Sequence, residues 1–149
     1  INKKTDKCSG SGLYGYIQQL YGIKKVFDIV QEYEKFNNIS IDYLCRMRTD
    51  VIFREPYYFN KYDIDNYVII PNFHYWDGIN DRFAIGTYKN MSVYMNMFTN
   101  IYNPIFNNIL NMKAEAFCKL NLIKNHINYK MEPILFKRIR ANGIILNDY

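Results

Sequence analysis

Apolar residues recur at spacings of three and four from Leu13 onward, and this periodicity predicts an amphipathic helix. Its apolar stripe comprises Leu13, Tyr16, Ile17, Leu20, Ile23, Phe27 and Val30. The pair Asn37-Asn38 suits a helix end and turn. Residues 1–12 are polar and close on alternating Ser and Gly, so we expect a flexible lead-in before a single domain spanning residues 13–149.

Short apolar runs between the helical stretches predict strands. The first half of residues 43–53 is apolar on both faces apart from Arg46, and residues 67–70 form a second run that Pro71 stops. Further strands are expected at 82–85, closed by Gly86, at 134–139, and at 144–146 after Gly143. Two more helices are predicted, one over the stripe from Met91 to Tyr102 and ended by Pro104, the other from Lys113 to about Asn125. Alternating helices and strands indicate an α/β fold with a mixed sheet.

Composition and charge limit the classes of binding partner and the cellular location that we expect. The net charge is +5 and the pI about 9.0, but the chain is rich in Asn, Ile, Lys and Tyr and contains no block of five like charges, so we expect no nucleic-acid partner. No apolar run approaches the roughly 18 residues of a membrane span. The three cysteines are widely spaced, which argues against zinc or disulfides and favours a reducing, cytoplasmic location. Cys45 lies within an apolar run and is expected in the core.

The strongest candidate site is the charged cluster at the end of the first predicted strand. Arg46, Arg48 and Asp50 follow one another at alternate positions there. In open α/β sheets ligands bind at the carboxyl ends of strands, where an Asp can hold a divalent cation and an Arg can clamp phosphate oxygens. The alternatives are a structural ion pair between an arginine and Asp50, or a plain surface turn.

Three further stretches carry candidate chemistry with weaker signals. Asn80 and Asp81 precede a short strand, where Asp81 could accept a sugar hydroxyl or act as a general base, or merely pair with Arg82 in a turn. Arg138 and Arg140 share one face of a strand, which is more often a solvated edge than an anion site. Glu115 falls early in a helix and is explained by the helix dipole.

Taken together, these stretches resemble a known family. Residues 43–51 (YLCRMRTDV) are similar to a strand of GT-A-like glycosyltransferases from large DNA viruses, algae and other protists, and residues 80–86 (NDRFAIG) closely resemble another of their segments. Met91 and Tyr94, the pair Ala114-Glu115 and residues 136–143 (FKRIRANG) follow in the same order. The resemblance covers nearly all of residues 13–149.

The resemblance implies a GT-A-like mixed sheet flanked by helices and a transferase that moves a sugar from a nucleotide-diphosphate sugar to a glycan or glycoprotein acceptor. Arg48, Asp50 and Arg140 would bind the diphosphate, Asp81 would be catalytic, and Asn80 and Trp76 would face the acceptor. Asp50 would hold Mn²⁺ or Mg²⁺, although Arg48 stands where the family's metal motif has its first carboxylate. The family's N-terminal nucleotide-binding segment has no counterpart before residue 13, and a viral member would act in the host cytoplasm or virus factory.

A rival interpretation belongs to another functional class. With one carboxylate in the metal motif and with the aromatic residues Phe73, Tyr75 and Trp76 in one loop, the chain could be a carbohydrate- or protein-binding module with a degenerate catalytic site. Glycan binding without turnover would separate it from the enzyme. A nucleic-acid-binding domain is the third and weakest possibility, since only the net charge favours it.

Overall fold

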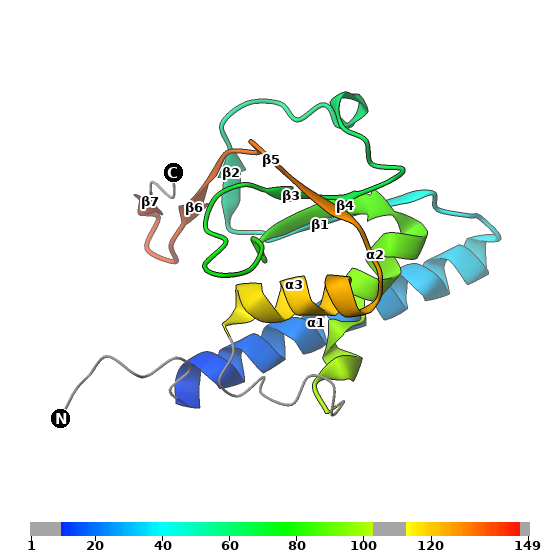
Figure 1. Ribbon diagram of the computed structural model, residues 1–149, viewed down its shortest axis with the longest axis horizontal. Coiled ribbons are helices and arrows are strands. Elements are labelled where there is room, and N and C mark those ends of the chain that lie inside the picture. The colour runs from blue at the N-terminus through cyan, green and yellow to red at the C-terminus, as the bar shows by residue number, and fades with distance from the viewer. Residues whose placement is uncertain (1–9, 103–112, 147–149) are drawn as a thin grey trace.

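A computed structural model describes residues 10–102 and 113–146 and shows a mixed α/β fold (Figure 1). The helices α1, α2 and α3 lie along one face of a four-stranded sheet, and the connection between β2 and β3 runs over the other face. A second, three-stranded sheet lies beside the first. The elements are α1 (Gly10–Asn37), β1 (Tyr43–Met47), β2 (Val51–Phe53), η1 (Phe59–Lys61), β3 (Val68–Pro71), β4 (Phe83–Thr87), α2 (Tyr88–Met95), η2 (Met97–Asn100), α3 (Ala114–Lys124), β5 (Tyr129–Glu132), β6 (Phe136–Ile139) and β7 (Ile145–Leu146).

Helix α1 confirms the predicted amphipathic pattern. Tyr16, Leu20 and Phe27 are buried on the side that faces the sheet. Spacings of three and four residues place them on one side of a helix of 3.6 residues per turn. The helix begins at Gly10, so residues 10–12, expected in the lead-in, belong to it. Once a helix is nucleated, each added residue gains one backbone hydrogen bond, which can outweigh the low propensity of Gly and Ser.

The four-stranded sheet has the order β1-β4-β3-β5. Strands β1, β4 and β3 are antiparallel neighbours, whereas β3 and β5 are parallel, as expected of a mixed sheet. All four residues of β3 are buried because both faces of the sheet are covered there. On the helix side, Val68, Ile70 and Ala84 pack with the helices; on the other side, Ile69, Phe83 and Ile85 join a second core.

The second core is aromatic and links the two sheets. The three-stranded sheet has the order β2-β6-β7 and is antiparallel throughout. Phe53 of β2 contacts Phe83 of β4 and Phe136 of β6, in both cases edge to face with ring centroids 5.7 Å apart. Such pairs add to the stabilisation from burial alone. These contacts hold the short strand β2 against the main sheet. The sequence pattern did not distinguish β2 from its surroundings.

Several predicted boundaries are confirmed and others shift. Helix α3 lies where Lys113 to about Asn125 was expected, and Gly143 adopts a φ of 79° in the turn before β7. The stripe from Met91 to Tyr102 is divided into α2 and the 3-10 helix η2, and Pro104 lies outside the described residues. Gly86 lies inside β4 instead of closing it. Strand β5 was not expected; it is short and carries Lys130 and Glu132, which weaken its apolar signal.

Cys45 corrects one prediction, because it is exposed. It pairs with Ile85 across β1 and β4, so its side chain faces the side of the sheet that carries the aromatic core. Within the described part of the chain, β1 is an edge strand of the sheet. An apolar strand at an edge has a neighbour on one side only, and the sequence pattern cannot distinguish this position from a central one.

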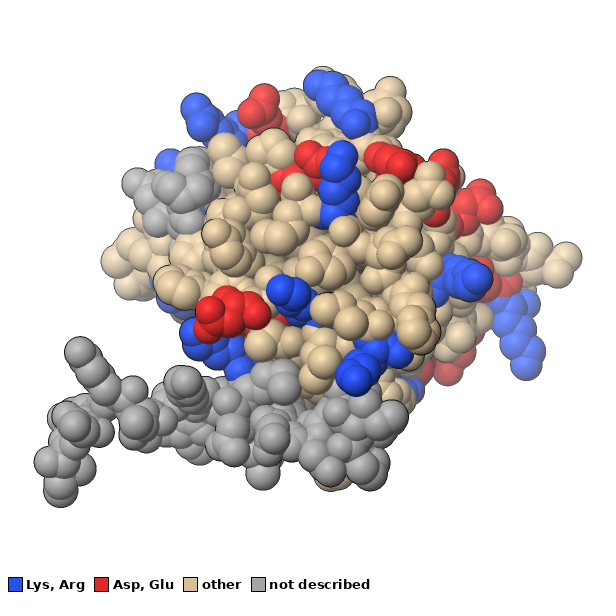
Figure 2. Space-filling view, in the orientation of Figure 1, with Lys and Arg blue, Asp and Glu red and all other residues tan. Residues whose placement is uncertain are grey.

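The described surface carries charges of both signs. On the face shown in Figure 2, Lys and Arg side chains are interspersed with Asp and Glu side chains over both the sheet and the helices. Within residues 10–102 and 113–146, every helix is too short or too polar to cross a lipid bilayer.

Candidate functional site

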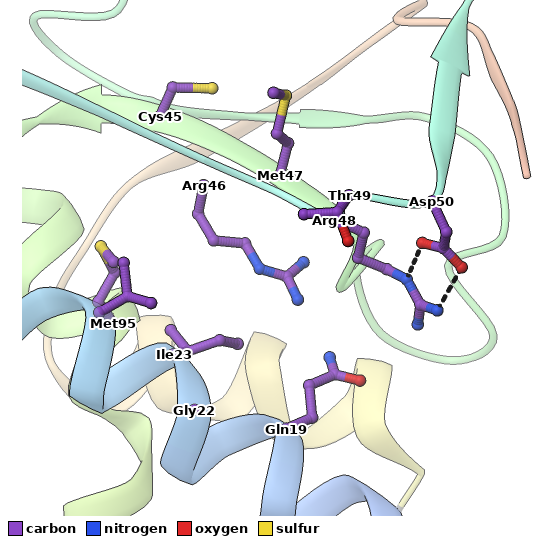
Figure 3. A pocket seen from close by; sticks show the side chains of 11 residues that line it. Gln19, Gly22, Ile23, Cys45, Arg46, Met47, Arg48, Thr49, Asp50 and Met95 are labelled. Atoms are coloured by element: carbon purple, nitrogen blue, oxygen red, sulfur yellow. Dashed lines mark hydrogen bonds and ion pairs between the residues drawn. The ribbon is translucent and has the colours of Figure 1, made fainter.

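A cavity of about 650 Å³ opens between α1 and the end of β1. Helix α1 supplies Gln19, Gly22, Ile23 and Val26 to its wall, and α2 supplies Met95. The opposite wall is the end of β1 and the turn that follows it, residues 45–50 (Figure 3). At this turn the chain leaves the four-stranded sheet and enters the three-stranded sheet, which separates the strand ends and leaves space beside the helix.

Arg48 and Asp50 face each other across this turn and form an ion pair, one of the alternatives left open for the first candidate cluster. Nε and Nη2 of Arg48 donate to the two carboxylate oxygens of Asp50, each at 2.7 Å. These hydrogen bonds hold the pKa of Asp50 below its usual value, and the charges of Arg48 and Arg138 act in the same direction. The structural ion pair considered from the sequence is therefore present, and it lies in the cavity wall.

Arg46 projects from β1 into the space between the strand and α1 (Figure 3). Its side chain is on the helix side of the sheet because it alternates with Cys45 and Met47. Only 8% of the residue is exposed, and Nη1 donates a hydrogen bond to the backbone carbonyl oxygen of Asp81. The sequence did contain a signal for this residue: a lone arginine within an apolar strand.

Asp81 connects the second candidate stretch to the cavity. Its carboxylate accepts a 3.0 Å hydrogen bond from Nε2 of Gln19, and its carbonyl oxygen accepts from Arg46. Asp81 is itself 8% exposed and does not line the cavity directly. Gln19 was missed by the sequence analysis, although a polar residue one position before Leu20 on the buried side of α1 is unusual enough to be noticed.

The half-buried carboxylate of Glu115 and the fully buried ring of Tyr94 lie near Asp81. Burial raises the pKa of Glu115, and the charge of Asp81 adds to the rise while that of Arg82 opposes it. Burial also raises the pKa of Tyr94, whose hydroxyl has no hydrogen-bond partner among the described residues. The candidate stretches around Asp50, Asp81 and Glu115, distant in sequence, thus meet in one region of the fold.

Asn80 is fully buried and shapes the loop that leads to Asp81. Its Nδ2 donates to the carbonyl oxygen of Phe73 at 2.8 Å, and its Oδ1 accepts from the backbone N–H of Arg82 at 2.8 Å. Both ends of the amide are therefore occupied within the protein. This geometry gives Asn80 a role in holding the loop, whereas the resemblance implied contact with an acceptor.

Trp76 and Arg140 lie outside the cavity wall. Trp76 is 55% exposed, packs against the ring of His74 and has a positive φ of 30°, in a loop that a 2.7 Å ion pair between Asp77 and Lys113 holds against α3. Arg140 is exposed just after β6, where its backbone closes the turn to Ile144. Of the two arginines expected on one strand face, Arg138 is the one whose charge acts on Asp50.

The cavity does not fit the metal site that the resemblance implies. Among the described residues, Asp50 is the one carboxylate in its wall, and Arg48 occupies both oxygens of that carboxylate. The described residues contain no group of three or more His, Cys, Asp or Glu side chains placed to hold a metal ion. Divalent cations such as Mg²⁺ are held by several oxygen ligands, so one engaged carboxylate is a poor site.

Comparison with known proteins places the chain in a family. Residues 3–140 match the model of a domain of unknown function, DUF7796. The chain belongs to this family. The matched region includes all the residues of the cavity wall, from Gln19 to Met95, together with Asp81 and Arg140. No curated protein and no solved structure matches the chain significantly.

Proposed function

We propose that this DUF7796 chain belongs to a nucleotide-sugar-dependent glycosyltransferase and that its cavity receives the diphosphate of the donor. The observation that carries the proposal is the gathering of Arg46, Arg48 and Asp50 in one cavity wall at a strand end. These residues come from the stretch that resembles the glycosyltransferase strand. The order of the other resembling stretches, which extend over the mixed α/β fold, also supports a GT-A-like architecture.

In this proposal the cavity stabilises the charge that develops on the departing nucleoside diphosphate. Electrostatic stabilisation by fixed groups is commonly the largest contribution to such catalysis. Because Asp50 is engaged by Arg48, we assign this charge compensation to guanidinium groups and route no step through Mn²⁺ or Mg²⁺. Asp50 then serves to hold Arg48 in the cavity wall, and the acceptor would be a glycan or glycoprotein.

The test is release of nucleoside diphosphate from a panel of UDP- and GDP-sugars by the full-length protein, with Mn²⁺ or with EDTA. We expect acceptor-dependent release that persists in EDTA. Asp50→Asn should lower it by at least about tenfold, because a hydrogen bond to a charged group contributes roughly 1.5–3 kcal/mol. The matched control is Asp42→Asn, an exposed carboxylate before β1. A folded protein that releases nothing from any donor would refute the proposal.

A second candidate function is a carbohydrate-binding module without catalysis. It is favoured by the engagement of the two candidate carboxylates, Asp50 by Arg48 and Asp81 by Gln19, together with the exposed ring of Trp76. Aromatic faces stack on sugar rings. Glycan binding without nucleoside diphosphate release, lost in Trp76→Ala, would support this function; retained binding in that variant would contradict it.

A further inference from the structure

The side chain of Arg46 is buried and has no close ion pair among the described residues, and the carboxylate of Asp81, whose backbone holds Arg46, is engaged by Gln19. The residue is 92% buried, and the hydrogen bond recorded for its side chain among the described residues is the one from Nη1 to the carbonyl oxygen of Asp81. No carboxylate in the described part of the chain lies within 4.0 Å of its guanidinium. Burying a charge away from water is unfavourable unless a counter-charge or several hydrogen bonds compensate it.

The surroundings of Arg46 indicate where further acceptors for its guanidinium N–H groups would come from. Its guanidinium lies in the cavity between β1 and α1 (Figure 3), so its remaining N–H groups can meet a ligand there. A guanidinium presents N–H groups in a planar fork that matches the oxygens of a phosphoryl group. Arg48 is less suited to this role, because Asp50 already occupies its Nε and Nη2.

We propose that Arg46 is the phosphoryl-binding residue of this cavity and that Asp81 positions it and does not act as a general base. The carbonyl oxygen of Asp81 holds one end of the guanidinium, and its carboxylate is tied to α1 through Gln19. Asp81 thus fixes the strand side chain and the helix side chain relative to each other.

The walls around Arg46 favour a particular class of ligand. Ile23, Val26 and Met95 contribute apolar surface, and about 650 Å³ is far more than a single anion needs. A ligand with a charged phosphoryl end and a larger, less polar remainder would fill both parts, as a nucleoside diphosphate does. The choice of a diphosphate rests on the proposed function, whereas the preference for an anion rests on the burial of Arg46 and its place in the cavity wall.

Binding of pyrophosphate and of UDP, measured by isothermal titration calorimetry on the full chain, tests the role of Arg46. We expect Arg46→Met to weaken both at least about tenfold, because a charge-assisted contact in a desolvated site is lost. Arg46→Lys keeps the charge without the fork and should weaken binding several-fold. Arg54→Met removes an exposed arginine after β2 and should leave the affinity unchanged. Wild-type affinity in both Arg46 variants, or no binding by the wild type, would overturn the proposal.

A stability measurement tests whether Arg46 contributes to ligand binding more than to the stability of the fold. A charge that is buried without a close ion pair is itself unfavourable, and its removal offsets the loss of the hydrogen bond to the carbonyl oxygen of Asp81. We therefore expect Arg46→Met, without ligand, to melt within a few degrees of the wild type or above it. Should Arg46→Met fail to fold, Arg46→Lys carries the binding test. Near-normal melting with lost pyrophosphate binding is the combined result that the proposal requires.

Asp81 is tested with two substitutions of different character. Asp81→Asn keeps the backbone carbonyl and an oxygen that accepts from Gln19, so pyrophosphate affinity should stay within about threefold of wild type. Asp81→Ala breaks the link to α1 and should weaken pyrophosphate binding about tenfold. Affinity should therefore be close to wild type with Asn at this position and lower with Ala. For nucleoside diphosphate release, loss of a general base would cost about 10²–10⁴-fold in kcat in both variants. Such a loss in Asp81→Asn would overturn the positioning role.

The two proposals fail in different ways. Binding of pyrophosphate that depends on Arg46, with no release from any sugar donor, would refute the transferase and leave the phosphoryl site standing. Release from a sugar donor that Arg46→Met leaves unchanged would support the transferase and refute the role of Arg46.

Discussion

At the scale of single residues, the site depends on how each charge is compensated. Arg48 and Asp50 compensate each other, Asp81 is held by Gln19, and Arg46 donates a hydrogen bond to the carbonyl oxygen of Asp81. The sequence left a pair between an arginine and Asp50 open as an alternative, but it did not indicate the partners of Asp81 and Arg46. Partners at separations of 35 residues, as for Arg46 and Asp81, and of 62 residues, as for Gln19 and Asp81, depend on strand register and helix packing.

The Arg48–Asp50 pair makes stability depend on pH in the acid range. Because hydrogen bonds from Arg48 lower the pKa of Asp50 in the folded state, the pair stabilises the protein above the unfolded-state pKa of about 4. This stabilisation is lost as the pH falls through the lower, folded-state value. We expect the wild type to unfold at a higher urea concentration than Asp50→Asn at pH 7, with the difference shrinking below about pH 4.

The measurement is a series of urea unfolding curves between pH 7 and pH 3 for the wild type, Asp50→Asn and the control Asp42→Asn. The urea midpoint of Asp50→Asn should lie below that of the wild type at pH 7 and approach it as the pH falls. The midpoint of Asp42→Asn should stay close to that of the wild type throughout. A difference between wild type and Asp50→Asn that stays constant across this range would contradict the lowered pKa of Asp50.

At the scale of elements, the site depends on close contacts between a loop and a helix. The loop before β4 passes so near the start of α3 that a Cβ atom on Gly78 would lie 2.0 Å from the backbone carbonyl carbon of Glu115. The backbone N–H of Ile79 donates to the carbonyl oxygen of Glu115 at 3.1 Å in the same contact. This approach holds Asn80 and Asp81 in place behind the cavity.

Gly78→Ala should therefore be severely destabilising. The added methyl group forces the loop away from α3, and we expect a loss of about 3 kcal/mol or more in the free energy of unfolding, in the range of overpacked cores and broken backbone contacts. The matched control is Gly15→Ala in α1, where a Cβ would meet nothing within 4 Å. There the change should stabilise by about 0.5–1 kcal/mol, because alanine favours a helix interior. Urea unfolding of both variants is the measurement; equal effects would contradict the close contact.

At the scale of the whole molecule, two cores lie on opposite faces of one sheet. The helix-side core contains Cys118, which is fully buried and whose pKa burial raises to about 12. On the other face, Cys45 of the edge strand β1 is exposed. These two thiols therefore report on different parts of the same fold.

Alkylation with iodoacetamide at pH 8, followed by peptide mass spectrometry, should modify Cys45 and spare Cys118 in the folded protein. Burial raises the pKa of both thiols, that of Cys45 to about 11 and that of Cys118 to about 12, so both react slowly at pH 8 and the contrast comes from access: iodoacetamide can reach the exposed Cys45 but not the buried Cys118. Addition of urea should expose Cys118 with the same midpoint as the loss of helical circular dichroism if the described domain unfolds as one unit. Modification of Cys118 in native buffer at the rate of Cys45 would contradict the packing of α3.

The sequence by itself determined the periodic elements: the helix up to Asn37, the strand at Tyr43–Met47, the helix α3 and the turn at Gly143. Local spacing and turn chemistry act over a few residues, so a sequence pattern is enough to reveal them. The tertiary structure alone decided that β1 is an edge strand and that Cys45 is exposed. It also decided that Arg46 and Gln19 meet at Asp81, because sheet order and burial arise from contacts between segments far apart in the chain.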